Sequence, residues 1–163
     1  MMKVPFLIMV IVMFLTGCLN AQDDLKSPGS KAAHDYLREK GFLIDSYEGE
    51  RGSYQLTKAN IKELPHMMEW GYFAEEGVDP ELYFNRNIQV EHFIVKDHPR
   101  FKKKAHVAVF LADNEPIGAT SVPWTDEEAL QAGWVYSLDG QTLEEVQPLP
   151  YPEWMQAWSK RYR

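Results

Sequence analysis

Four residues with side chains suited to proton transfer or metal binding lie close together in the chain: His92, Asp97, His98 and His106. Imidazole exchanges protons near neutral pH, and a carboxylate can orient it. If the connection between the two predicted strands spans 97–101, His92 faces His106 with Cβ atoms about 4.5–5.5 Å apart. These four residues are therefore a candidate site for a metal ion or for general acid–base catalysis.

The same histidines also have a purely structural interpretation. A one-residue change in strand register would move one of them to the other face of the sheet. A histidine on an apolar strand face is also often a core residue whose ring nitrogen is satisfied by one hydrogen bond. We therefore predict that the purified protein contains no stoichiometric metal and uses no cofactor.

No familiar catalytic motif accompanies these residues. The sequence lacks the G-x-S-x-G nucleophile turn, the phosphate-binding glycine loop and the H-E-x-x-H zinc motif. This favours a non-enzymatic module that binds a peptide, another envelope protein or a cell-wall component. The alternative is an envelope hydrolase, with or without a metal, that uses the three histidines with a carboxylate from Asp97 or Glu91.

The only cysteine, Cys18, marks the boundary between an apolar and a polar segment. A basic start (1–3), an apolar run (4–15) and two small residues have the layout of a secretory signal peptide. The apolar run is shorter than the roughly 20 residues that span a bilayer. The junction LTGC (15–18) resembles the lipobox of bacterial lipoproteins, in which the cysteine sulfur receives a diacylglycerol and the chain is cut before it. We predict that 1–17 is a signal peptide and that Cys18 is lipidated.

Lipidation of Cys18 would leave no thiol for a disulfide, a metal or a nucleophile. Removal of 1–17 takes away Lys3, which changes the formal net charge from −7 to −8 and leaves 146 of the 163 residues. An acidic chain is repelled by nucleic acid, so we expect no nucleic-acid partner. The predicted organisation is a flexible lipidated tether (18–30) and one extracytoplasmic domain (31–163), held on the cell membrane by acylated Cys18.

One short basic run stands out in this acidic sequence, RFKKK at 100–104. It falls in a predicted connection between two strands. A solvated loop tip is one interpretation of it. The other is contact with anionic lipid headgroups, which attract basic residues near the membrane surface. The candidate contact residues are Arg100, Lys102, Lys103 and Lys104.

The chain after the tether predicts an α+β domain: an antiparallel β-meander with an N-terminal helix, short middle helices and a C-terminal helix packed on it. Three β-prone segments, NIQVEHFIVK, AHVAVFLA and PIGATSV, follow one another with short connections. Short connections force neighbouring strands to be antiparallel. Such a sheet leaves an open face or edge that could accept a partner.

Turn and capping residues predict the other elements. The acidic segment 71–86 lacks the ligand spacing of a calcium loop and is expected to be a solvated turn. The terminal helix carries Tyr151, Met155, Trp158 and Tyr162 at helical spacing, which we expect to pack on the sheet. The remaining expected elements are a helix from Pro28 or Ser30 to Lys40, a hairpin around Gly49 and Gly52, a helix from Thr57 to Leu64, a capped helix at 125–133 and a hairpin at Asp139 and Gly140.

The segments YLREKGFLIDSYEGE, YQLTKANIKELP, FIVKDHP, VAVFLADNEPIGA and YSLDGQTLEEV give the chain a resemblance to a family of small lipoproteins of unknown function from Gram-positive bacteria. The resemblance covers roughly 34–147. Where the relatives tend to have Ile-Gly-Gly, this chain has Ala119 in place of the second glycine. The resemblance implies a lipid-anchored extracellular α+β domain and no assigned chemistry.

Overall fold

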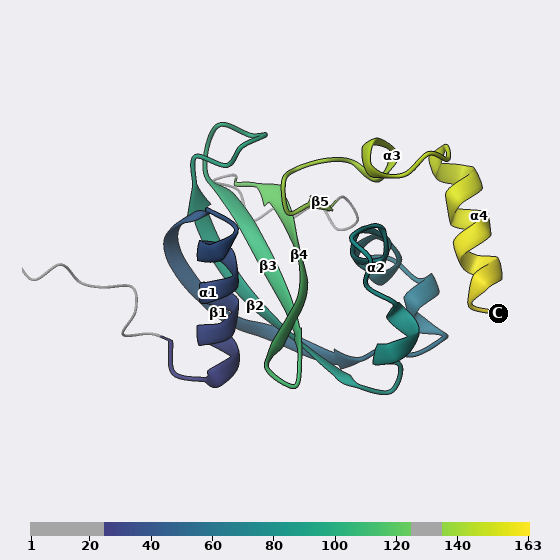
Figure 1. Ribbon diagram of the computed structural model, residues 1–163, viewed down its shortest axis with the longest axis horizontal. Helices are drawn as coiled ribbons and strands as arrows, with labels where there is room; N and C mark the ends of the chain where they lie inside the picture. The colour runs from purple at the N-terminus through teal and green to yellow at the C-terminus, as the bar shows by residue number, and fades with distance from the viewer. Residues whose placement is uncertain (1–24, 125–134) are drawn as a thin grey trace, which may run out of the picture.

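Five antiparallel strands form one sheet in the computed structural model, which describes residues 25–124 and 135–163 (Figure 1). The strands lie in the sheet in chain order, so the sheet is a meander, and the predicted α+β class is confirmed. In chain order the elements are α1 (Pro28–Glu39), β1 (Leu43–Gln55), η2 (Asn60–Lys62), α2 (His66–Glu75), η3 (Pro80–Tyr83), β2 (Asn87–Lys96), β3 (Ala105–Ala112), β4 (Glu115–Pro123), β5 (Tyr136–Ser137), α3 (Leu143–Val146) and α4 (Tyr151–Arg161).

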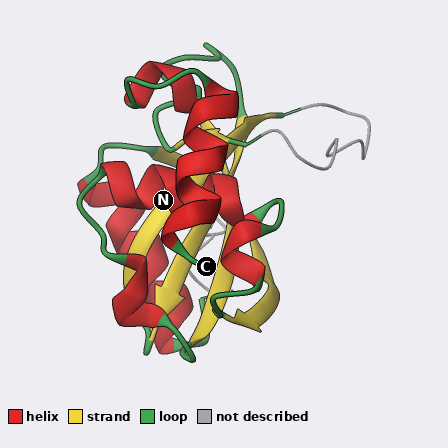
Figure 2. Cartoon of the chain, turned by 90° about the vertical axis from the view of Figure 1, so that its right-hand side faces the viewer, coloured by secondary structure: helices red, strands yellow, loops and turns green. Residues whose placement is uncertain are grey.

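The central strands β2, β3 and β4 are the three β-prone segments of the sequence. Their alternating residues divide between two apolar clusters, one on each face of the sheet. Phe93 and Val95 belong to the cluster under α1, whereas Ile88 and Val90 belong to the cluster under α2 and α4. Figure 1 shows α1 and α2 on opposite sides of these strands, and Figure 2 shows helices in front of the strands when the molecule is viewed from the α4 end.

Strand β1 differs from the prediction, because the hairpin expected around Gly49 and Gly52 is one continuous strand. Both glycines have a positive φ, 93° and 107°, at points where the pairing with β2 shifts register. They therefore form bulges, which absorb extra residues without reversing the chain. The two halves of the strand stay paired with β2, through Tyr47 opposite Phe93 and Tyr54 opposite Ile88.

Helix α1 begins within the predicted range and ends at the predicted stop. At its end the backbone N–H of Phe42 donates to the carbonyl oxygen of Leu37 at 3.0 Å, and Gly41 has a φ of 86°. These are the features of a Schellman ending. The predicted tether of 18–30 is too long on its C-terminal side, because Leu25 is 6% exposed and packs in the cluster under α1.

Helix α4 packs on α2 and the segment before it, not on the sheet as expected. The indole ring of Trp154 lies against Gly71 of α2, where a Cβ would come within 2.7 Å of it. The indole N–H of Trp158 donates to the carbonyl oxygen of Ile61 at 2.9 Å. Met155, predicted to lie on the packed face, is 36% exposed.

Four further expectations concern turns and short helices. Asp139 and Gly140 form a turn, but α3 follows it instead of a second hairpin strand. The helix expected from Thr57 to Leu64 is the short 3-10 helix η2, and part of the expected acidic turn at 71–86 continues α2 and forms η3. The capped helix expected at 125–133 lies outside the described residues, as does Cys18.

Candidate functional site

The structure does not bring His98 together with the other candidate residues. Its ring is fully buried, Nε2 donates to the carbonyl oxygen of Leu138 at 2.9 Å, and Nδ1 accepts from the backbone N–H of Arg100 at 3.3 Å. This assignment follows from the hydrogen-bond network, since a backbone N–H can only donate. Burial lowers the pKa of His98, which favours the neutral ring. His98 therefore fastens the β2–β3 connection to the turn at 138–140, and both ring nitrogens are used.

His92 and His106 share a face of the sheet, but they are not opposite one another. His92 pairs with Ala108 and His106 pairs with Ile94, so the two histidines are diagonal neighbours. The expected register assumed a connection of 97–101, whereas the strands are joined by 97–104. A shift of two residues keeps both side chains on one face, with diagonal positions about 7–8 Å apart.

The environment of this histidine pair disfavours positive charge. Burial lowers the pKa of His92 to about 4, and the nearby charges of Arg51 and His106 act in the same direction. Burial also lowers the pKa of His106. Within residues 25–124 and 135–163, no group of three or more His, Cys, Asp or Glu side chains is arranged to hold a metal ion.

Asp97 lines an open pocket beside the end of β2. Its φ of 47° is in the left-handed region, at the point where the chain leaves β2. The pocket has a volume of about 300 Å³ and opens where α1 ends beside the ends of β1 and β2. Its walls carry both signs of charge, from two lysines and two aspartates. The lining residues are Lys40, Gly41, Phe42, Leu43, Lys96, Asp97, Pro99 and Asp139.

The four basic candidates for membrane contact do not share one environment. Arg100 pairs with Glu145 at 3.0 Å, and Lys104 forms an ion pair with Asp45. Lys102 and Lys103 are exposed, and among the described residues neither has an acidic side chain within 4.0 Å. Half of the predicted basic surface is therefore neutralised within the domain.

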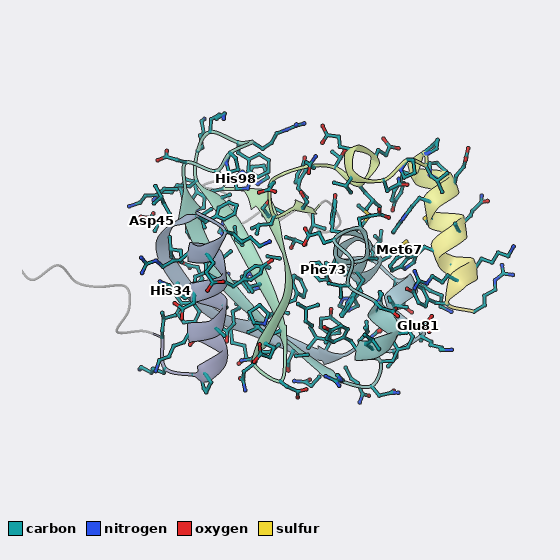
Figure 3. The ribbon with its side chains drawn as sticks, viewed as in Figure 1. His34, Asp45, Met67, Phe73, Glu81 and His98 are labelled. Carbon is teal, nitrogen blue, oxygen red and sulfur yellow. The ribbon has the colours of Figure 1, made fainter. Side chains whose placement is uncertain are left out.

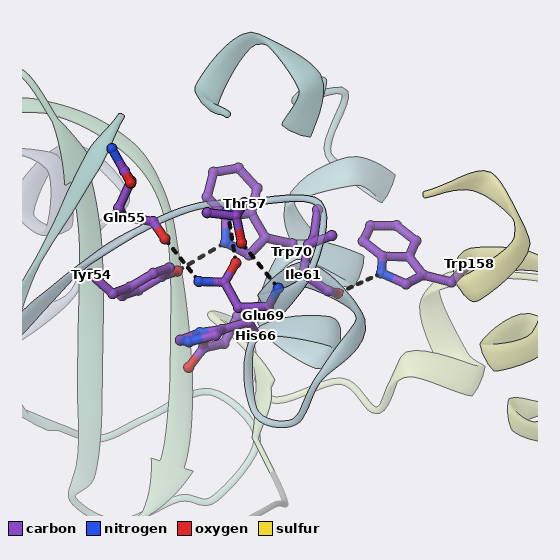
Figure 4. A network of polar contacts seen from close by, with 9 residues as sticks. Tyr54, Gln55, Thr57, Ile61, His66, Glu69, Trp70 and Trp158 are labelled. Carbon is purple, nitrogen blue, oxygen red and sulfur yellow. Dashed lines mark hydrogen bonds and ion pairs between the residues drawn. The ribbon is translucent and has the colours of Figure 1, made fainter. Parts of the chain in front are cut away.

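A polar cluster that the sequence analysis missed lies at the start of α2 (Figure 4). His66 Nδ1 is 3.1 Å from Glu69 Oε2, and the ring of Tyr54 stacks on the imidazole with centroids 4.0 Å apart. The hydroxyl of Tyr54 accepts from the indole N–H of Trp70 at 2.9 Å. Burial and the Glu69 charge raise the pKa of Tyr54. The spacing of His66 and Glu69, three residues apart on a helix, is the sequence signal that would have found the pair.

This cluster has an oriented imidazole, but among the described residues no hydroxyl or thiol forms a hydrogen bond with it. Glu69 is 8% exposed and is the only hydrogen-bond partner of the His66 side chain among the described residues. A histidine held by a carboxylate resembles two members of a catalytic triad, but a triad also needs a hydroxyl or thiol within hydrogen-bond reach of the other ring nitrogen. The cluster is therefore best described as a structural link between β1 and α2.

Comparison of the chain with protein-family models, curated proteins and solved structures finds no match. The family resemblance in the sequence therefore remains a prediction. Among the described residues, no helix has the length and apolar character needed to cross a membrane.

Proposed function

We propose that this protein is a lipid-anchored binding module on the outer face of the cell membrane. The anchor would be the acylated sulfur of Cys18, because the residues before it have the layout of a lipoprotein signal. Two acyl chains hold a protein on a bilayer far better than the marginal binding of one. The module would bind a peptide, another envelope protein or a wall component.

The pocket at the end of α1 is the observation that carries the binding role. It is open and about 300 Å³ in volume, and its lining includes two basic residues, Lys40 and Lys96, and two acidic residues, Asp97 and Asp139. Both signs of charge in one small pocket suit a ligand that itself carries amino and carboxylate groups, as peptides do. Pockets of this volume are at the lower end of the range for small-molecule sites.

Photo-crosslinking in intact cells tests this proposal. A photoreactive amino acid in place of Lys40 samples the pocket rim, and the same amino acid in place of Lys58, an exposed residue before η2, is the control. We expect a crosslinked partner with the probe at Lys40 that is absent with the probe at Lys58. Identical crosslinking patterns from the two positions would contradict a binding role for the pocket.

The alternative function, an envelope hydrolase, would need a different set of residues from those the sequence suggested. His92, His98, His106 and Asp97 are not gathered in one site. Within the described part of the chain, a carboxylate holds an imidazole at His66, through Glu69 at 3.1 Å, and at His34, through Asp35 at 3.3 Å. Glu69 is largely buried whereas Asp35 is exposed, so His66 is the better candidate. Turnover of an ester or a wall fragment that is lost in His66→Gln would favour this alternative.

A further inference from the structure

One end of the sheet carries a row of four residues on neighbouring strands, which we call the terminal row: Leu43, Lys96, Lys104 and Trp124. Leu43 pairs with Lys96, and the backbone N–H of Trp124 donates to the carbonyl oxygen of Lys104 at 3.1 Å. Val95 of β2 pairs with Ala105 of β3, so the next residue outward on each strand, Lys96 and Lys104 respectively, lies beside the other. The two outer members are apolar and exposed, Leu43 by 60% and Trp124 by 38%.

The two central lysines of the terminal row are held in place. Asp45 binds Lys96 at 2.8 Å and also pairs with Lys104, and the ammonium of Lys104 lies 5.8 Å from the ring centre of Trp124. Figure 3 shows Asp45 and His98 at this end of the molecule, away from Glu81. The row is therefore a fixed surface of two apolar side chains around a lysine pair.

The connection beyond the terminal row adds free positive charge. His98 fixes this loop, because its backbone N–H donates to the carbonyl oxygen of Lys103 and the N–H of Lys102 donates to the carbonyl oxygen of His98. Lys102 and Lys103 stay exposed on it. At the opposite end of the sheet, the β3–β4 turn exposes Glu115 and Asp113, and Asp113 pairs with Arg86 at 3.2 Å. The two exposed lysines of the β2–β3 connection therefore lie at one end of the sheet, and the exposed carboxylate of Glu115 lies at the other.

We propose that, in the anchored protein, the terminal row rests on the anionic lipid surface. Tryptophan favours the headgroup region of a bilayer, and exposed lysines are attracted to anionic headgroups. Leu43 and Trp124 would enter the headgroup region, with Lys102 and Lys103 beside the phosphates. The β3–β4 turn would point away from the membrane, which keeps the exposed carboxylate of Glu115 away from the anionic headgroups.

The length of chain between the anchor and the domain permits this orientation. The proposal rests on the lipid anchor at Cys18, seven residues before Leu25, and seven residues extend over at most about 25 Å. Helix α1 has 12 residues and is therefore about 18 Å long. Lys40, after the end of α1, lines the same pocket as Pro99 of the β2–β3 connection, so α1 runs toward the terminal row. An extended tether can therefore follow α1 as far as that row.

A fluorescent label tests the orientation in the full-length acylated protein. Since Cys18 is the only cysteine and is acylated, a single new cysteine can be labelled selectively. We place a nitrobenzoxadiazole label at Leu43→Cys, and at Asp113→Cys as the matched control, in vesicles of phosphatidylglycerol or of phosphatidylcholine. We expect the label at position 43, and not the one at 113, to become shielded from an aqueous quencher in phosphatidylglycerol vesicles. The double change Lys102→Gln and Lys103→Gln should reverse that shielding.

Two results would overturn the proposal, and they differ in what else they contradict. Equal quenching at positions 43 and 113, with the protein still sedimenting with the vesicles, contradicts the orientation and leaves the anchor intact. Failure of the protein to sediment with either vesicle contradicts the anchor at Cys18 and the orientation that depends on it.

Discussion

Replacement of Trp158 by alanine tests whether α4 is part of the stable core. Trp158 is 6% exposed, and its ring lies between those of Trp154 and Tyr162, with centroid distances of 5.1 and 4.9 Å. Removal of a buried tryptophan costs about 3–5 kcal/mol. The change also leaves the carbonyl oxygen of Ile61 without its indole donor, which places the expected loss at the upper end of that range.

Urea denaturation and thermal unfolding measure this loss. A loss of about 5 kcal/mol corresponds to a fall in Tm of about 10–20 °C for a domain of this size. Trp158→Phe keeps most of the ring but removes the donor, so it should cost about 1–3 kcal/mol. Leu82→Ala, at a residue that is 68% exposed, is the control and should change the free energy of unfolding by less than about 0.5 kcal/mol. If Trp158→Ala costs no more than that control, α4 is not part of the core.

Three further predictions concern the anchor, the histidine pair and metal content. Cys18→Ser should release the protein from the membrane or leave it unprocessed, and mass spectrometry of the mature N-terminus decides this; an unmodified Cys18 in a membrane-retained mature protein would falsify the lipid anchor. The lowered pKa of His92 means that the unfolded chain binds more protons between pH 6.5 and about 4. The contribution of His92 to the free energy of unfolding should therefore be fully present above pH 6.5. The free energy of unfolding should fall by up to about 3 kcal/mol as the pH drops through that window, and by less in His92→Gln; equal slopes of this free energy against pH in the two proteins would refute the prediction. Elemental analysis should find no stoichiometric metal, whereas one zinc per chain that is lost in both His92→Ala and His106→Ala would promote the enzyme alternative.

The sequence predicted the central sheet because two independent signals agreed there. Alternating apolar residues identified the strands, and short connections required them to be antiparallel. β1 was mistaken for a hairpin because a glycine with positive φ serves both turns and bulges. Only the pairing of Tyr47 and Tyr54 with β2 distinguishes the two, and that pairing involves residues more than 30 positions away.

The candidate site was harder to predict for the same reason. His98 is fixed by the carbonyl oxygen of Leu138, 40 residues further along the chain, so nothing near it in the sequence indicates a structural role. The diagonal offset of His92 and His106 depends on a connection whose length was underestimated by three residues. The contact of His66 with Glu69 is local, by contrast, and helical spacing alone would have identified it.

The pocket and the terminal row share Leu43 and Lys96, so the two proposals constrain each other. If the terminal row rests on the membrane, the pocket opens at the level of the lipid headgroups. A ligand that is itself held on the membrane would then meet the pocket by diffusion in two dimensions, at a raised effective concentration. We therefore expect the crosslink at Lys40 to depend on the anchor and to be lost when Cys18→Ser releases the domain into the medium. Release must be checked by fractionation, and the released domain must melt at the same temperature as the anchored protein. A crosslink of undiminished yield to the released domain would mean that the ligand is soluble and that the pocket does not depend on the membrane.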